Sequence, residues 1–116
     1  RAKTIKQEIQ IFSAEDLARI SVIKFEGLLV NFARQKNATI IIRGLRAVSD
    51  FEYEFQMSAM NSKLNSDIQT IFLPASENHH FTASKLVREI ARLGGDISKF
   101  VSKNVVSKLQ KKLFAK

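Results

Sequence analysis

The spacing of apolar residues divides the chain into helical and extended segments. In five segments apolar residues recur every three or four positions, which predicts a helix in each: residues 1–9, 27–35, 49–64, 82–93 and 102–114. Three short runs of β-branched and other apolar residues predict strands: residues 20–25, 39–42 and 69–73. A capping box at Ser49 is expected to begin the third helix, and Gly94-Gly95 to end the fourth.

The order of these segments predicts an α/β fold. Strands that alternate with helices and lack polar alternation are typical of a parallel sheet with helices on both faces. Residues 39–42, a continuous β-branched run, are expected to be buried on both faces. In open parallel sheets, ligands bind beyond the carboxyl ends of the strands. The segments 26–27, 43–46 and 74–84 are therefore expected to lie on one rim.

Composition and charge restrict the class of protein. The 116 residues suffice for one domain, 45% of them are apolar, and there is no cysteine, which excludes disulfide frameworks. The longest apolar run is too short to span a bilayer, and no secretory signal is visible, which fits a cytosolic protein. Lys plus Arg is 19 against 11 Asp plus Glu, a net charge of +8. This charge favours a polyanionic partner: nucleic acid, a membrane surface or a phosphorylated small molecule.

Arg43-Gly44-Leu45-Arg46 is the most informative short segment. The glycine lets the backbone approach a ligand closely, and two guanidinium groups three residues apart at a strand end are suited to bind phosphate oxygens. Each arginine is equally suited to pair with a nearby acid, namely Asp50, Glu52 or Glu54. Spacing alone does not decide between phosphate binding and pairing with a nearby acid.

The segment from His79 to Lys85 precedes a predicted helix. Thr82 is its expected N-cap, which would leave the N–H groups of Ala83, Ser84 and Lys85 available for a phosphate, although caps of this composition are common. The two histidines have no obvious third ligand, so a metal site is not expected. An exposed, solvated pair is the simplest interpretation, and stacking on or hydrogen bonding to a nucleotide is the alternative.

The helix at 49–64 carries a polar and an apolar stripe. Asp50, Glu54, Ser58 and Asn61 share one face, whose spacing favours a solvated surface. Tyr53, Met57 and Met60 are expected in the core or in a contact between subunits. No P-loop, G-x-G-x-x-G or G-x-S-x-G motif is present.

Several segments together resemble the bacterial phosphopantetheine adenylyltransferase family of coenzyme A synthesis. The strongest is Arg43-Gly44-Leu45-Arg46 followed by Asp50-Phe51-Glu52-Tyr53-Glu54, and the likeness runs from about residue 20 to residue 113. It extends to Asn31-Phe32-Ala33-Arg34, to Thr70-Ile71-Phe72-Leu73-Pro74, and to the run from Phe81 to Glu89. The resemblance implies a Rossmann-like, three-layer nucleotidyltransferase domain over residues 1–116.

The resemblance also implies an activity and a set of site residues. The activity is adenylyl transfer from ATP to 4′-phosphopantetheine, assisted by Mg²⁺, in a cytoplasmic hexamer that coenzyme A can inhibit; neither a membrane nor a nucleic acid is an expected partner. Leu29 and Arg43 would contact phosphopantetheine. The residues that would contact ATP are Gly44, Leu45, Arg46, Glu54, His79, His80, Phe81, Thr82, Ala83, Ser84 and Lys85.

The sequence departs from the family pattern in two ways. It contains no Gly-His pair, whose histidine stabilises the transition state in the family, so no catalytic residue is assigned here and the N-terminal strands are expected to be missing. Ala83 and Lys85 stand where the family usually has serines. We therefore expect the C-terminal two-thirds of the family domain, with impaired activity when isolated. The alternatives are a basic nucleic-acid-binding module and a non-catalytic, nucleotide-binding oligomerisation domain.

Overall fold

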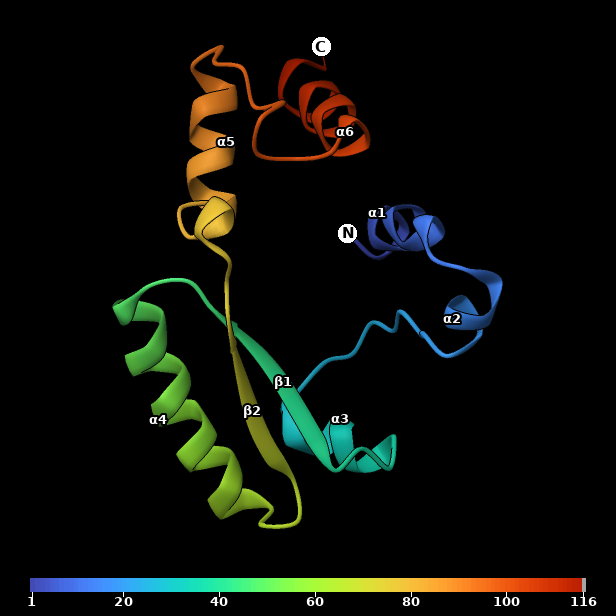
Figure 1. Cartoon of the computed structure of the whole chain (residues 1–116), viewed down its shortest axis with the longest axis vertical. Helices are drawn as coiled ribbons and strands as arrows, with labels where there is room; N and C mark the ends of the chain where they lie inside the picture. The colour runs from blue at the N-terminus through green and yellow to red at the C-terminus, as the bar shows by residue number, and fades with distance from the viewer. Residues whose placement is uncertain (116) are drawn as a thin grey trace. The chain divides into compact units, whose positions relative to one another are not determined.

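A computed structural model describes residues 1–115, which divide into two compact units (Figure 1). One unit comprises residues 25–81, and the other comprises residues 1–24 and the chain from residue 82 onward. The elements are α1 (Ala2–Glu8), a 3₁₀ turn (Ile9–Ile11), α2 (Ala14–Ala18), α3 (Leu29–Gln35), β1 (Ile40–Leu45), α4 (Val48–Leu64), β2 (Gln69–Pro74), a 3₁₀ turn (Glu77–His79), α5 (Ser84–Arg92) and α6 (Lys103–Phe114).

The parallel sheet predicted from the sequence is confirmed in the unit 25–81. β1 and β2 pair in parallel from Ile40 opposite Gln69 to Leu45 opposite Pro74. The strand predicted at residues 20–25 is wrong, because these residues have no regular secondary structure. Apolar, β-branched composition is a preference that becomes a strand only where a neighbouring strand pairs with it, and no described strand does so here.

Helices cover one face of this two-stranded sheet. Ile41 is buried with Val30 and Ala33 of α3 and with Ile68. Arg43 lies on the same face as Ile41, since side chains alternate along a strand, and it bonds Glu54 of α4. Both α3 and α4 therefore lie on that face.

The opposite face of the sheet is apolar and open within this unit. Ile40 and Ile42 of β1 are exposed, and so are Ile71 and Leu73 of β2. The expectation that residues 39–42 are buried on both faces is therefore wrong for this unit, because both of its helices pack on the other side.

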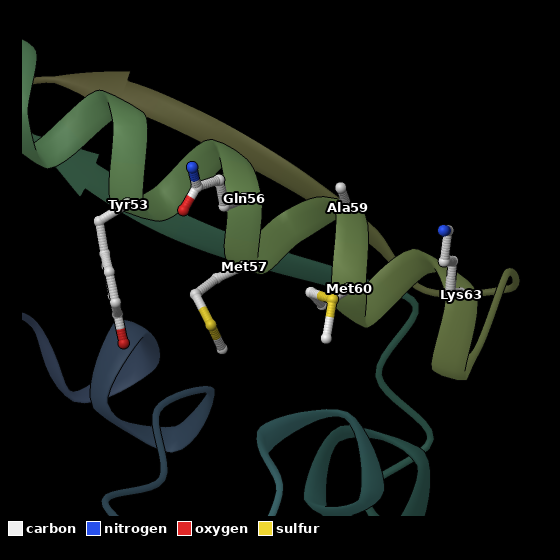
Figure 2. A pocket seen from close by; sticks show the side chains of 6 residues that line it. All are labelled: Tyr53, Gln56, Met57, Ala59, Met60 and Lys63. Carbon is white, nitrogen blue, oxygen red and sulfur yellow. The ribbon is translucent and has the colours of Figure 1, made fainter.

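The helix α4 turns its polar stripe toward the strands and its apolar stripe outward. Asp50, Glu54, Ser58 and Asn61 are its partly buried residues, so the prediction of a solvated polar face is wrong. Tyr53, Met57 and Met60 are exposed, so of the two predicted roles the core is wrong, and a contact between subunits stays a prediction. Together with Gln56, Ala59 and Lys63 they line a shallow pocket of about 420 Å³ along α4. The side chains of Tyr53, Met57 and Met60 extend from the same side of this helix (Figure 2).

The strand-ward face of α4 is fixed by charge pairs and aromatic packing rather than by aliphatic burial. Phe51 packs against Phe72 of β2 with ring centroids 6.4 Å apart and stacks on Phe55 at 5.6 Å. The predicted capping box at Ser49 is not formed, since the N-cap is Ala47. Asp50 instead accepts a hydrogen bond from the backbone N–H of Arg46.

In the other unit, α5 packs against α6. Its core consists of Val87, Ala91 and Ile97, with Val106 and Leu109 of α6 packed against them. Of the residues predicted to face inward on α5, Leu86 and Leu93 are exposed. Among the described residues, every helix is too short or too polar to cross a bilayer.

The predicted ends of α5 and α6 are largely confirmed. Gly94, with φ +80°, follows Leu93, the C-cap of α5, and the N–H of Gly95 donates to the carbonyl of Ile90, so the two glycines end the helix as expected. Ser102 caps α6 by accepting a hydrogen bond from the N–H of Val105. Thr82, however, is not the N-cap of α5, which is Ala83.

Candidate phosphate-binding site

The segment from Arg43 to Arg46 lies at the carboxyl end of the parallel sheet. The sequence placed it after a strand ending at residue 42, but β1 continues to Leu45 because Arg43, Gly44 and Leu45 pair in register with β2. The N–H of Ala75 donates to the carbonyl of Leu45, so the chain leaves both strands at the same edge. The predicted rim is confirmed for residues 43–46 and the start of the segment after β2, while no described strand ends before residues 26–27.

Arg43 is held by a bidentate ion pair with Glu54 of α4. Its Nε donates to Glu54 Oε2 at 2.8 Å and its Nη2 to Oε1 at 2.5 Å. The arginine side chain is 44% exposed and the glutamate 13%. The pair therefore fixes a guanidinium group whose side chain still reaches solvent.

Arg46 is held in the same way by Asp50. Its Nε donates to Asp50 Oδ2 at 3.0 Å, and its Nη2 donates to Oδ1 at 3.3 Å. The interpretation that these arginines pair with nearby acids is therefore confirmed, with Asp50 and Glu54 as the partners. Pairing with one carboxylate does not by itself remove an arginine as a phosphate ligand, because a guanidinium has five N–H donors.

The two ion pairs lower the pKa of both carboxyl groups. Hydrogen bonds from Arg43 hold the pKa of Glu54 below its ordinary value of 4.5, against an opposing effect of burial. Hydrogen bonds from the Arg46 side chain do the same for the pKa of Asp50. Both acids are therefore ionised at neutral pH, and the arrangement is two fixed cation–anion pairs at the end of β1.

The depressed pKa of Glu54 leads to a testable pH dependence. Because the folded pKa lies below 4.5, the pair stabilises the fold fully above that pH and is lost as the pH falls through the folded value. An NMR titration of the Glu54 carboxyl carbon is expected to give a midpoint below 4.5, and Arg43→Gln is expected to raise it. An unchanged midpoint in that variant would contradict the pairing.

The residues predicted to follow β2 form a short turn rather than an open loop. His79 ends the 3₁₀ turn, and Phe81 is almost fully exposed. His80 is partly buried, and its Nε2 lies 2.8 Å from the carbonyl oxygen of Ala75. The His80 ring thus closes the turn onto the strand end, a role that the sequence did not indicate.

Thr82, Ala83, Ser84 and Lys85 belong to the other unit, at the start of α5. Ala83 accepts the first helical hydrogen bond, from the N–H of Val87, which makes Ser84 and Lys85 the first helical residues. In the first turn of any α-helix the N–H groups have no partner within the helix. The expected set of phosphate-binding N–H groups therefore shifts one residue onward, to Ser84, Lys85 and Leu86.

The remaining predicted residues are placed as follows. Leu29 is the first residue of α3 and packs partly buried against the core, whereas phosphopantetheine contact was expected of it. A Cβ added at Gly44 would meet no atom within 4 Å, so the backbone there is open to close approach. Leu45 is the last, partly buried residue of β1.

The described residues contain no group of three or more His, Asp or Glu side chains arranged to hold a metal ion. The two carboxylates near the strand end, Asp50 and Glu54, are each paired with an arginine.

Comparison with known proteins places the chain in a family. The cytidylyltransferase-like family model matches residues 6–90, which include β1, α4, β2 and most of α5. The chain is 66% identical over 88 residues to a phosphopantetheine adenylyltransferase of Wolbachia pipientis (subsp. Culex pipiens), covering 76% of this chain and 52% of that protein.

Two further relatives bear the same name. The protein of Azoarcus sp. (strain BH72) is 48% identical over 115 residues, covering 97% of this chain and 71% of that protein. The protein of Nitrosomonas eutropha is 58% identical over 95 residues, covering 82% and 58%. The chain spans about half the length of the Wolbachia relatives it matches. The sequence and the parallel strand–helix arrangement thus agree that the chain belongs to the cytidylyltransferase-like family and, within it, to the phosphopantetheine adenylyltransferases.

Proposed function

We propose that this chain forms the substrate-binding part of an enzyme that transfers the adenylyl group of ATP to 4′-phosphopantetheine. The products are dephospho-coenzyme A and pyrophosphate. The observation that supports this most strongly is the pair of fixed guanidinium groups at the carboxyl end of β1. It occurs in a chain whose relatives are named phosphopantetheine adenylyltransferase.

The reaction suits a site made of cations and backbone N–H groups. A phosphate oxygen of the acceptor attacks the α-phosphorus of ATP, a new P–O bond forms, and the bond to pyrophosphate breaks. No covalent nucleophile from the protein is needed, so catalysis rests on positioning and on neutralising charge.

The proposal assigns a role to each group of residues. Arg43 orients the phosphate of the acceptor, and Leu29 contacts its pantetheine part. Arg46, with Gly44, Leu45 and Glu54, binds ATP at the strand end. His79, His80 and Phe81 are assigned further ATP contacts in the same unit. Residues 82–85, at the start of α5 in the other unit, keep the ATP-binding role that the family resemblance implies.

Mg²⁺ is proposed to arrive with the nucleotide. Mg²⁺ in such sites is usually held by substrate phosphates and water, with few protein ligands, and the described residues offer no cluster of ligands. Inhibition by coenzyme A, which contains the acceptor's phosphopantetheine moiety, is proposed at the same surface.

A hexamer is proposed from the family together with the outer face of α4. Tyr53, Met57 and Met60 leave an apolar strip exposed, which a second copy of the chain would cover (Figure 2). Light scattering of the purified chain tests this assembly, and a monomer at high concentration would contradict it for this chain.

The experiment that tests the function combines binding with product formation. The purified chain is titrated with ATP plus Mg²⁺ and, separately, with 4′-phosphopantetheine, and dephospho-coenzyme A and pyrophosphate are then measured with both substrates present. We expect both substrates to bind and turnover to be low, because the sequence has no Gly-His pair. Binding of neither substrate, with tight and steeply salt-dependent oligonucleotide binding, would instead favour a nucleic-acid-binding module.

A further inference from the structure

Asp50 makes more hydrogen bonds to Arg46 than a simple ion pair requires. Its Oδ2 accepts from the Arg46 backbone N–H at 3.1 Å and from the Arg46 Nε at 3.0 Å. Its Oδ1 accepts from the Arg46 Nη2 at 3.3 Å. One carboxylate therefore fixes both the main chain and the side chain of the residue that follows β1.

We propose that Asp50 is a positioning residue, which holds the Arg46 guanidinium in the orientation that binds the phosphates of ATP. The inference rests on the proposed function, since it takes Arg46 as a nucleotide ligand. It adds a residue to which the resemblance assigned no role.

The place of Asp50 in α4 explains why it can hold Arg46 firmly. It is the third residue of the helix, where the helix dipole and the backbone N–H groups stabilise a negative charge. The pKa of Asp50 is lowered by the Arg46 side chain and by the backbone of Arg46 and Ala47, so the carboxylate stays charged at neutral pH.

Holding the arginine in advance favours binding. A mobile arginine side chain loses rotamer entropy when a ligand immobilises it, and a pre-ordered one loses less. The neighbouring pair repeats this arrangement one turn later, where Glu54 holds Arg43. The carboxylates of α4 thus order the cations of β1 and of the residue after it.

The chain offers a matched control for Asp50. Glu52 lies two residues further along α4 and is exposed, and within the described part of the chain it forms no ion pair with either arginine. Asp50→Asn and Glu52→Gln remove the same charge. Asp50→Asn also leaves a single acceptor oxygen, so the three hydrogen bonds from Arg46 cannot all form.

The test has one readout that is independent of nucleotide and two that depend on ligands. In the ligand-free chain, hydrogen exchange of the Arg46 amide is expected to be at least about threefold faster in Asp50→Asn, since its acceptor is weakened. By calorimetry, ATP affinity is expected to fall about three- to tenfold, within the range for a partly exposed charged pair. Affinity for 4′-phosphopantetheine is expected to stay within about twofold, because Arg43 keeps its own partner.

Three comparisons decide the outcome. Asp50→Glu, which keeps the charge, is expected to restore part of the ATP affinity, and Glu52→Gln to leave all three readouts unchanged. If Arg46→Gln weakens ATP binding but Asp50→Asn does not, the positioning role is wrong while the proposed function stands. If neither variant affects ATP binding, both assignments are wrong, and amide exchange still shows whether Asp50 holds Arg46.

Discussion

Replacing Arg43 by glutamine is expected to weaken 4′-phosphopantetheine binding by about 10- to 100-fold, the range for losing a charge-assisted contact to phosphate. Glutamine keeps a polar N–H donor, but it is shorter than arginine and lacks the charge and the guanidinium fork. It also leaves Glu54, which is largely shielded from solvent, without its cationic partner. Both effects remove positive potential from the strand end, and calorimetry of the two substrates measures the loss.

The matched control for this prediction is Arg34→Gln. Arg34 lies in the last turn of α3, carries the same charge and is exposed. If the binding of 4′-phosphopantetheine depends on net charge alone, the two variants will weaken it equally, and the assignment of Arg43 fails. We expect the Arg34 variant to remain within about twofold of the parent chain.

A charge placed at Val30 is expected to unfold the unit 25–81. Val30 is 2% exposed and is packed with Ala33, Ile41 and Ile68 in the small core that joins α3 to β1. An unpaired carboxylate there has no partner, and the cost is expected to exceed about 3 kcal/mol, a large part of the stability of a small unit. Thermal unfolding followed by circular dichroism, with amide exchange at Ile41, measures the effect of Val30→Asp.

Val48→Asp provides the matched control. Val48 is the first residue of α4 and is 78% exposed, and a carboxylate in the first turn of a helix is favourable. We expect this variant to keep or slightly raise the stability of the chain. Val30→Ala should give an intermediate loss, and equal stability of the Val30→Asp and Val48→Asp variants would contradict the core described here.

The helix ends that the sequence predicted correctly depend on local chemistry. Gly94 has a positive φ that few other residues adopt at low cost, so the end of α5 could be placed from the sequence. The start predicted for α6 at residue 102 is confirmed to within one residue, since Ser102 caps a helix that begins at Lys103. The parallel pairing of β1 and β2 is also confirmed, although it joins strands that α4 separates in the chain and follows from the alternation of strands and helices rather than from local chemistry.

The incorrect predictions concern features that depend on distant parts of the chain. The strand expected at residues 20–25 lacks a described partner, and strand propensity alone does not supply one. The apolar stripe of α4 through Met57 suggests either the core or a subunit contact, and the core is wrong because the stripe is exposed. The deciding interactions were instead the ion pairs from Glu54 and Asp50 to the arginines at the end of β1.

Part of the candidate site could be predicted and part could not. The sequence identified Arg43 and Arg46, and it left open whether each pairs with an acid. Spacing could not decide between Asp50, Glu52 and Glu54, since this depends on which side of α4 meets β1. A signal for Asp50 was present in its four-residue separation from Arg46.

The most direct test of the phosphate site is an NMR titration of the arginine Nε–Hε groups with each substrate in turn. The account predicts that 4′-phosphopantetheine shifts the Arg43 signal and ATP with Mg²⁺ shifts the Arg46 signal, each to saturation, while the Arg34 signal stays in place. Signals of Arg43 and Arg46 that remain unmoved at saturating substrate, or that move no more than that of Arg34, would contradict it.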